Sequence, residues 1–188
     1  LHDALPISVY SGSITGTDGS VSMDTGGTTR WTGTSQFSRL QLVKGRMQLD
    51  GQLTLTNSEE GLTVGDAVSA GGLKPVLTVG NGAKVSALGR TVQVDAGDGT
   101  QLGIVGAGSL LTTGFQTLVG NHANGRLVVE GGGRLTAGTY LGMGYDNGGK
   151  GTLQVGAGGS VTSDVGMLGV LVGATGSADV AGSGAQWA

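Results

Sequence analysis

Apolar and polar residues alternate in short runs along most of this chain, and one such run recurs at a fixed interval. Four copies align without gaps: LTVGNGAKV (77–85), LGIVGAGSL (102–110), LVVEGGGRL (127–135) and LQVGAGGSV (153–161). A fifth copy starts at Ala178, so the intervals between copies are 25, 25, 26 and 25 residues. A repeat of this length is typical of stacked architectures, in which each unit buries its apolar face against the next.

Within each copy every second residue is apolar, which is the period of a strand with one buried face. The first apolar column contains Leu77, Leu102, Leu127, Leu153 and Ala178, and the second contains Val79, Ile104, Val129, Val155 and Val180. A column beyond the glycine turn contains Val85, Leu110, Leu135 and Val161. A further strand is predicted around Val92 and Val94, Leu118 and Val119, Leu141 and Met143, and Leu171 and Val172.

A unit of about 25 residues with two or three short strands cannot bury its apolar face alone. Stacking solves this, because each strand then pairs in parallel with its counterpart about 4.8 Å away. The sequence therefore predicts an all-β fold, a parallel β-helix (β-solenoid) with coils of about 25 residues.

Glycines occupy the turn between the first and second strands, at Gly82, Gly108, Gly133 and Gly159. The run GGG at 131–133 also matches a phosphate-binding loop in composition, but such a loop occurs once, between a strand and a helix. Here the glycines recur in every unit. A sharp corner repeated along a stack needs positive φ and room for the next coil, and glycine provides both. The pattern favours a structural corner.

The period is less regular towards the N-terminus. Residues 40–55 still alternate, and residues 61–72 resemble a shortened coil whose Leu62 and Val64 match the ladder. We expect the solenoid to cover residues 40–188, most clearly 75–188, after an irregular first coil or cap at 8–39. Residues 1–7, LHDALPI, match the translation of a sequencing adapter, so we expect them to be an artefact and the N-terminus to be truncated.

Composition excludes several classes of protein. Glycine supplies 41 of 188 residues, the net charge is −3 and cysteine is absent. The chain therefore lacks the basic surface that binds nucleic acid, and it has neither disulfides nor thiolate metal sites. The apolar run at 165–174 is too short to insert in a bilayer. No motif indicates a cofactor.

Two segments, GTLQVGAGGSVT (151–162) and ATGSADVAGSGAQW (174–187), resemble the β-strand repeat of bacterial autotransporter (type V secretion) passenger domains. Residues 29–55 are similar to such a passenger too, and the resemblance covers most of 29–188. A closely similar repeat occurs in exported proteins sorted by a PEP-type C-terminal signal. The resemblance implies a right-handed β-helix, exported through the periplasm of a Gram-negative bacterium to the cell surface or beyond. It also implies a C-terminal outer-membrane β-barrel as partner, so we expect a fragment at both ends.

Polar residues gather in the turn that follows the last strand of each unit, in DAGDG (95–99), NHANG (121–125) and YDNGGKG (145–151). Stacking would bring Asp95, Asp98, His122 and Asp146 onto one edge, with Lys150 nearby. Such groups serve polysaccharide lyases and hydrolases, and turn carboxylates also bind calcium. Asp and Asn favour turns for conformational reasons alone, however, and the next coil has ATG there. We expect a structural edge without catalytic, cofactor or metal-binding residues.

Another column contains Arg90, Phe115, Tyr140 and Gly166, each 13 residues after the first ladder position. An exposed aromatic strip beside arginine would suit carbohydrate, but we favour an aromatic ladder that stiffens the solenoid. The function expected from all these features is a non-enzymatic stalk or adhesin that contacts host or environmental surfaces, carbohydrate among them. The alternatives are a carbohydrate-active β-helix and a structural protein of an exopolysaccharide matrix.

Overall fold

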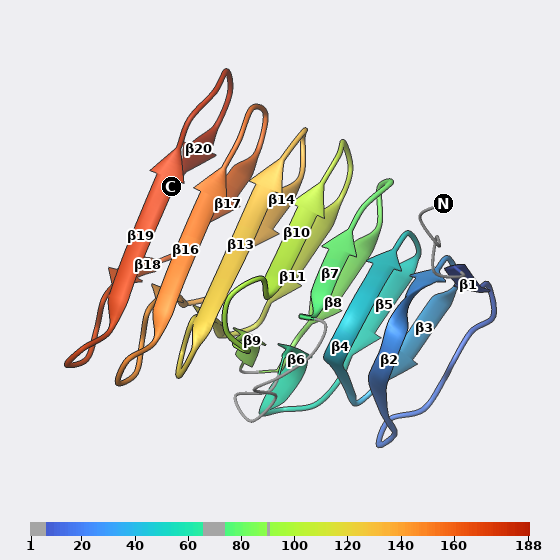
Figure 1. Ribbon diagram of the computed structural model, residues 1–188. Helices are drawn as coiled ribbons and strands as arrows, with labels where there is room; N and C mark the ends of the chain where they lie inside the picture. The colour runs from blue at the N-terminus through green and yellow to red at the C-terminus, as the bar shows by residue number, and fades with distance from the viewer. Residues whose placement is uncertain (1–6, 66–73, 90) are drawn as a thin grey trace, which may run out of the picture.

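A computed structural model describes residues 7–65, 74–89 and 91–188, and within them the chain forms twenty strands and no helix. The strands stack side by side from the N-terminal to the C-terminal end of the molecule, coil upon coil (Figure 1). Every strand pair in the described residues is parallel, and in the regular part each strand pairs with the third strand before it and the third after it. The predicted parallel β-helix is therefore confirmed.

Each regular coil contributes one strand to each of three rows. Row one contains β7 (Val76–Val79), β10 (Gln101–Val105), β13 (Asn124–Glu130), β16 (Lys150–Val155) and β19 (Thr175–Val180). Row two contains β3 (Thr34–Phe37), β5 (Gln52–Leu55), β8 (Lys84–Ala87), β11 (Leu110–Thr113), β14 (Arg134–Thr136), β17 (Ser160–Thr162) and β20 (Gln186–Trp187). Row three contains β6 (Glu60–Val64), β9 (Thr91–Val94), β12 (Gln116–Val119), β15 (Tyr140–Met143) and β18 (Val165–Leu168).

The first coils are built differently, because two long strands turn from row three into row one without a break. β1 (Ile7–Tyr10) pairs with the second half of β2 (Ser20–Trp31), and β2 pairs along its length with β4 (Arg39–Leu49). The first half of β4 pairs with β6 and its second half with β7, so β4 joins rows one and three into one sheet. Residues 1–6 lie outside the described part of the chain, and the adapter origin of residues 1–7 stays a prediction.

Aliphatic side chains fill the interior along the row-one strands. Leu102 pairs with Leu77 on one side and Leu127 on the other, and Ile104 pairs in the same way with Val79 and Val129. The column continues to Leu153 and Val155, and all of these residues are fully buried. The last rung, Ala178 and Val180, pairs in register but is exposed. The inward residues thus form unbroken stacks, in which each coil covers the apolar face of its neighbour.

In row two, the observed strand pairing differs by one residue from the gapless alignment of the sequence repeats. Leu111, not Leu110, pairs with both Val85 and Leu135, and it is fully buried. Leu111 follows the inward residue Ile104 by seven positions, whereas Val85 follows Val79 by six and Leu135 follows Val129 by six. Ser109 closes this longer connection by donating from Oγ to the carbonyl of Val105 at 2.8 Å. Since inward and outward positions alternate along a strand, one extra residue places Leu111 instead of Leu110 at the inward position.

Row three needs corrections as well. Thr117, rather than Leu118, pairs with the inward residues Val92 and Leu141, and it is completely buried. Leu171 and Val172 lie beyond the end of β18. Within β18, Gly166 and Leu168 are the residues that pair with Leu141 and Met143. Both errors arise from scoring apolar character alone, whereas the alternation of the strand decides which side chain points inward.

Leu62 and Val64 lie in a different ladder from the one predicted. They pair with Leu40 and Leu42 on one side and with Val92 and Val94 on the other, which places them in row three. Met47 and Leu49 occupy the row-one positions beside Leu77 and Val79. Residues 61–64 therefore belong to the row-three strand β6, and residues 66–72 of the predicted shortened coil lie outside the described residues.

The four corner glycines meet two different requirements. Gly82 and Gly108 have φ of 78° and 81°, in the left-handed region. Gly133 and Gly159 do not, but a Cβ there would lie 2.1 Å from the carbonyl oxygen of Ile104 and 2.2 Å from that of Val129, respectively. At these two positions glycine is needed because the backbone of the previous coil comes so close.

The described part of the chain contains no helix that could span a membrane.

The aromatic core is confined to the N-terminal coils, where the Trp31 ring packs against Tyr10 and Phe37 at centroid distances of 4.9 and 5.8 Å.

Candidate functional site

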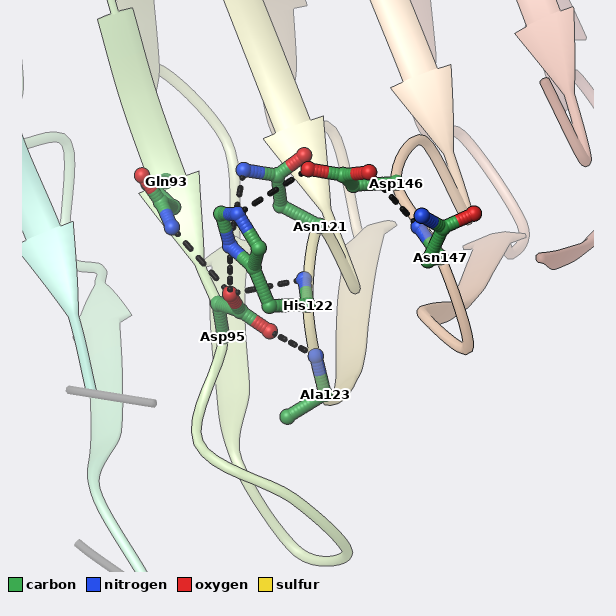
Figure 2. Close-up of polar contacts among 7 residues, drawn as sticks. All are labelled: Gln93, Asp95, Asn121, His122, Ala123, Asp146 and Asn147. Atoms are coloured by element: carbon green, nitrogen blue, oxygen red, sulfur yellow. Dashed lines mark hydrogen bonds and ion pairs between the residues drawn. The ribbon is translucent and has the colours of Figure 1, made fainter. Parts of the chain in front are cut away.

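Three of the predicted polar residues meet on one edge of the solenoid, in the turns that follow consecutive row-three strands. Asp95 directly follows β9, His122 lies in the turn after β12, and Asp146 lies in the turn after β15. Figure 2 shows the imidazole of His122 between the two carboxylates. Stacking places these residues together because corresponding turns of successive coils lie one above the other.

Asp95 is the buried anchor of this cluster, with an exposed fraction of 1%. Its carboxylate accepts hydrogen bonds from the backbone N–H groups of His122 at 2.9 Å and Ala123 at 2.6 Å, and from Nε2 of Gln93 at 3.1 Å (Figure 2). A carboxylate buried at a turn needs such donors to compensate for lost hydration. Asp95 therefore fixes the turn of the following coil instead of capping its own.

His122 connects three successive coils. Its Nδ1 lies 3.2 Å from Oδ2 of Asp95, and its Nε2 lies 3.1 Å from Oδ2 of Asp146. The imidazole is 52% exposed, and the Asp146 side chain is 35% exposed. Asp146 also accepts from the backbone N–H of Asn147 at 2.7 Å, which is a local turn contact. The Asp95–His122–Asp146 cluster joins the turns across the coils.

Asp98 lies apart from this cluster. Its carboxylate accepts a hydrogen bond from the side-chain amide of Asn124. Asp98, Arg126 and Lys150 line a separate hollow of about 300 Å³ on the row-one side of the turn. Among the described residues no ion pair joins Asp98 to Lys150. The four residues expected on a single edge are thus divided between two places.

The aromatic column is interrupted as well. Phe115 and Tyr140 make an edge-to-face contact with centroids 5.3 Å apart, but Tyr140 pairs in register with Gln116. Gly166 pairs with Leu141, and the Trp187 ring packs against it. Arg90 lies outside the described residues. The two rings form one partly exposed pair on the row-three side, and the described residues do not continue it into a ladder.

The contacts of the Asp95–His122–Asp146 cluster join the turns of three successive coils. Asp–His pairs act in proton transfer when a nucleophile or a substrate group lies within hydrogen-bonding reach. Among the described residues His122 contacts only Asn121, Asp95 and Asp146 through its ring. No group of three or more His, Asp or Glu side chains in the described part of the chain is placed to hold a metal ion.

The sequence did not indicate a second buried carboxylate, Asp50, which follows β4. Asp50 has a side chain only 5% exposed and accepts from Nε of Arg30 at 2.5 Å and from the amides of Gln48 and Asn81, both at 2.9 Å. Burial works to raise the pKa of Asp50, but these hydrogen bonds and the charge of Arg30 outweigh it, so its pKa lies below the ordinary value. The irregular spacing of the first coils hides this arrangement from a repeat alignment.

A lateral groove on the outer face of row three was also missed. Its polar lining consists of Arg39, Gln41, Glu60, Thr63, Gln93 and His122, and its volume is about 280 Å³. The signal was present in the sequence, because Gln41, Thr63 and Gln93 are the polar residues between pairs of buried aliphatic residues. Only the strand register shows that they lie next to one another.

The fold and the site of this chain are thus those of a β-solenoid with repeated parallel coils and a polar edge. The coils hold the Asp95–His122–Asp146 cluster on one edge and the lateral groove beside it, with His122 common to both. A scan against protein-family models, a search of the curated proteins and a search of the solved structures each found no match to the chain.

Proposed function

We propose that this chain is part of a surface-displayed or secreted β-helical rod, similar to autotransporter passengers, that acts as a structural stalk and adhesin. The observation that supports the proposal is the continuous stacking of the rows, with row one extending from β4 to β19 through five successive pairings. Such a stack resists bending and extends in one direction, which suits a part that holds other elements away from a cell.

The proposed mechanism is mechanical and multivalent. Backbone hydrogen bonds between coils and the buried aliphatic columns make the rod stiff. The outer faces of the rows repeat from coil to coil, so weak contacts with an extended surface add up to a strong attachment. We place the rod outside a Gram-negative cell, on the strength of the repeat resemblance at 151–162 and 174–187.

Adhesion can be tested directly with beads that carry the purified chain. We expect coated beads to attach to host cells or to a bacterial matrix better than albumin-coated beads. The matched control is Val129→Asp, which places an unpaired charge in the row-one interior and is expected to destabilise the stack by several kcal/mol. Equal attachment of wild-type and albumin-coated beads would refute the adhesive role.

Asp98→Ala and Asp146→Ala distinguish the rod from a carbohydrate-active β-helix. A polysaccharide-cleaving activity that used the polar edge would fall by orders of magnitude in one of these variants. An adhesive rod would keep its attachment, because both side chains lie outside the aliphatic interior. Measuring reducing ends released from plant and bacterial polysaccharides, beside bead attachment, separates the two functions.

The matrix-protein alternative is settled by sequencing the gene on both sides. Downstream amphipathic strands of about ten residues would support the autotransporter origin. A single apolar helix followed by arginines would support a sorted exopolysaccharide-associated protein instead.

A further inference from the structure

The lateral groove lies across the strands of three successive coils at the outer face of row three. Gln41 on β4 pairs in register with Thr63 on β6, which pairs with Gln93 on β9. Their neighbours along each strand, such as Leu62 and Val64, are fully buried. By alternation the three polar side chains lie on the outer side of the sheet and form a column with a repeat of about 4.8 Å. Gln41 and Gln93 are partly exposed, and Thr63 between them is 7% exposed.

A second set of polar groups borders this column. Arg39 forms an ion pair with Glu60 at 2.8 Å, and its Nη2 donates to Oγ1 of Thr63 at 3.3 Å. The Nε–H of Arg39 is buried and has no hydrogen-bond partner among the described residues. A buried donor without a partner destabilises the fold. The accessible part of the Arg39 guanidinium, whose side chain is 33% exposed, can donate to an acceptor oxygen on a bound molecule.

The charges in the groove select against a polyanion. The positive charge of Arg39 is balanced by Glu60, and His122 is held between two carboxylates. Polyanions need a concentrated positive field, and the groove offers none. Its lining combines amide, hydroxyl, carboxylate and guanidinium groups, which both donate and accept hydrogen bonds. It has no apolar pocket for the side chains of a peptide.

We propose that the lateral groove binds a neutral glycan, with the sugar chain lying along the solenoid axis. Hydroxyl groups both donate and accept, so successive sugars can pair with the whole amide of Gln41, with the amide oxygen of Gln93, whose Nε2 donates to Asp95, and with the hydroxyl proton of Thr63, whose oxygen accepts from Arg39. Binding along the axis uses one polar residue per coil. The inference rests on the proposed adhesive function, and it names the class of surface molecule that the rod contacts.

The experiment is an NMR titration of the isotope-labelled chain with glucose hexasaccharides, one β-1,4-, one β-1,3- and one α-1,4-linked. We expect at least one of them to shift the amide signals of β4, β6 and β9, with little change in row two. Gln41→Ala should weaken binding by about five- to tenfold, which corresponds to the loss of one or two hydrogen bonds. Gln41 makes no side-chain hydrogen bond among the described residues, so we expect the variant to fold normally.

The matched control is Gln101→Ala, which removes an outward, partly buried glutamine from β10 in row one. It should leave the affinity unchanged. Three results would overturn the inference: no shift with any of the hexasaccharides, equal weakening by both variants, or binding confined to an anionic oligogalacturonate or to a peptide library. Bead attachment without glycan binding would refute this inference alone. Glycan binding without bead attachment would refute the adhesive function while leaving the groove as a glycan site.

Discussion

Aspartate side chains in this solenoid differ in burial: some are buried with several hydrogen-bond partners, and others are more exposed with fewer partners. Asp50 and Asp95 both belong to the first group, and each accepts three or more hydrogen bonds from donors that include a neighbouring coil. Asp98 and Asp146, in contrast, are more exposed and have fewer partners: Asp98 accepts from the amide of Asn124, and Asp146 contacts His122 and the backbone N–H of Asn147. Position in the coil, and not residue type, therefore determines how much each carboxylate stabilises the fold.

Asp50 should make the stability of the protein depend on acid pH. Because its pKa is lower in the folded state than in the unfolded chain, its contribution is present above the unfolded value of about 3.9 and is lost as the pH falls through the folded value. Thermal unfolding of the wild type and of Asp50→Asn should differ most near neutral pH, with the wild type more stable. The two curves should converge as the pH falls below the folded-state pKa of Asp50. A constant difference at every pH would contradict this assignment.

Asp95→Ala tests the anchor of the polar edge. The change leaves the backbone N–H groups of His122 and Ala123 without their acceptor, at about 1–3 kcal/mol for each group that water does not reach. The control Asp146→Ala removes a more exposed contact and should change stability by less than about 1 kcal/mol. Urea unfolding measures both, and amide hydrogen exchange at residues 122 and 123 should accelerate only in Asp95→Ala. A larger effect at Asp146 would show that the anchor has been misassigned.

At the scale of the strand and its turn, the short distance between coils limits which residues fit at the corner positions. The turn from row one to row two brings glycine backbone against the carbonyl groups of the previous coil. Where a turn gains a residue, as before β11, the following strand shifts its inward face by one position. Each corner thus fixes both the distance between coils and the register of the next strand.

Gly133→Ala and Gly82→Ala separate close approach from backbone conformation. The new Cβ at Gly133 would meet a backbone oxygen of Ile104 that cannot move without disturbing the ladder, so we expect a loss of about 3 kcal/mol or more. At Gly82 the nearest atom is 3.8 Å away, and only the left-handed φ is unfavourable, by about 1–2 kcal/mol. Denaturant unfolding of both variants checks this order, and the reverse order would refute the distinction.

At the scale of the whole molecule, regular coils behave as interchangeable layers, because each contacts mainly its two neighbours. The coils from β7 to β18 follow one register, whereas the coils containing β2 and β4 do not. The regular part should therefore tolerate the loss of a layer, and the N-terminal part should not.

Deleting residues 126–151 removes one coil and joins Gly125 to Thr152, the register partner of Arg126. We expect a folded rod, shorter by about 4.8 Å, because Leu153 then stacks on Leu102 as Leu127 did. Small-angle X-ray scattering and circular dichroism measure the length and the strand content. Deleting only residues 126–138, about half a coil, should instead give an aggregated chain. The strands after the deletion would then no longer lie beside strands of their own row. Aggregation of both deletions would argue against interchangeable coils.

The sequence by itself determined the β-helix, its coil length and the row-one columns from Leu77 and Val79 onward. This was possible because alternation and a 25-residue spacing are local properties of the chain, and parallel stacking brings equal positions together. It also marked the turns that hold Asp95, His122 and Asp146.

Only the tertiary structure decided which residues face inward where the spacing changes, as at Leu111 and Thr117. The same applies to Asp50 and to the lateral groove, whose members come from coils of unequal length. The physical reason is that a strand reverses its faces with every residue, so one inserted residue alters all later contacts of that strand. The hydrogen bonds between coils, which a sequence pattern does not contain, then select the register.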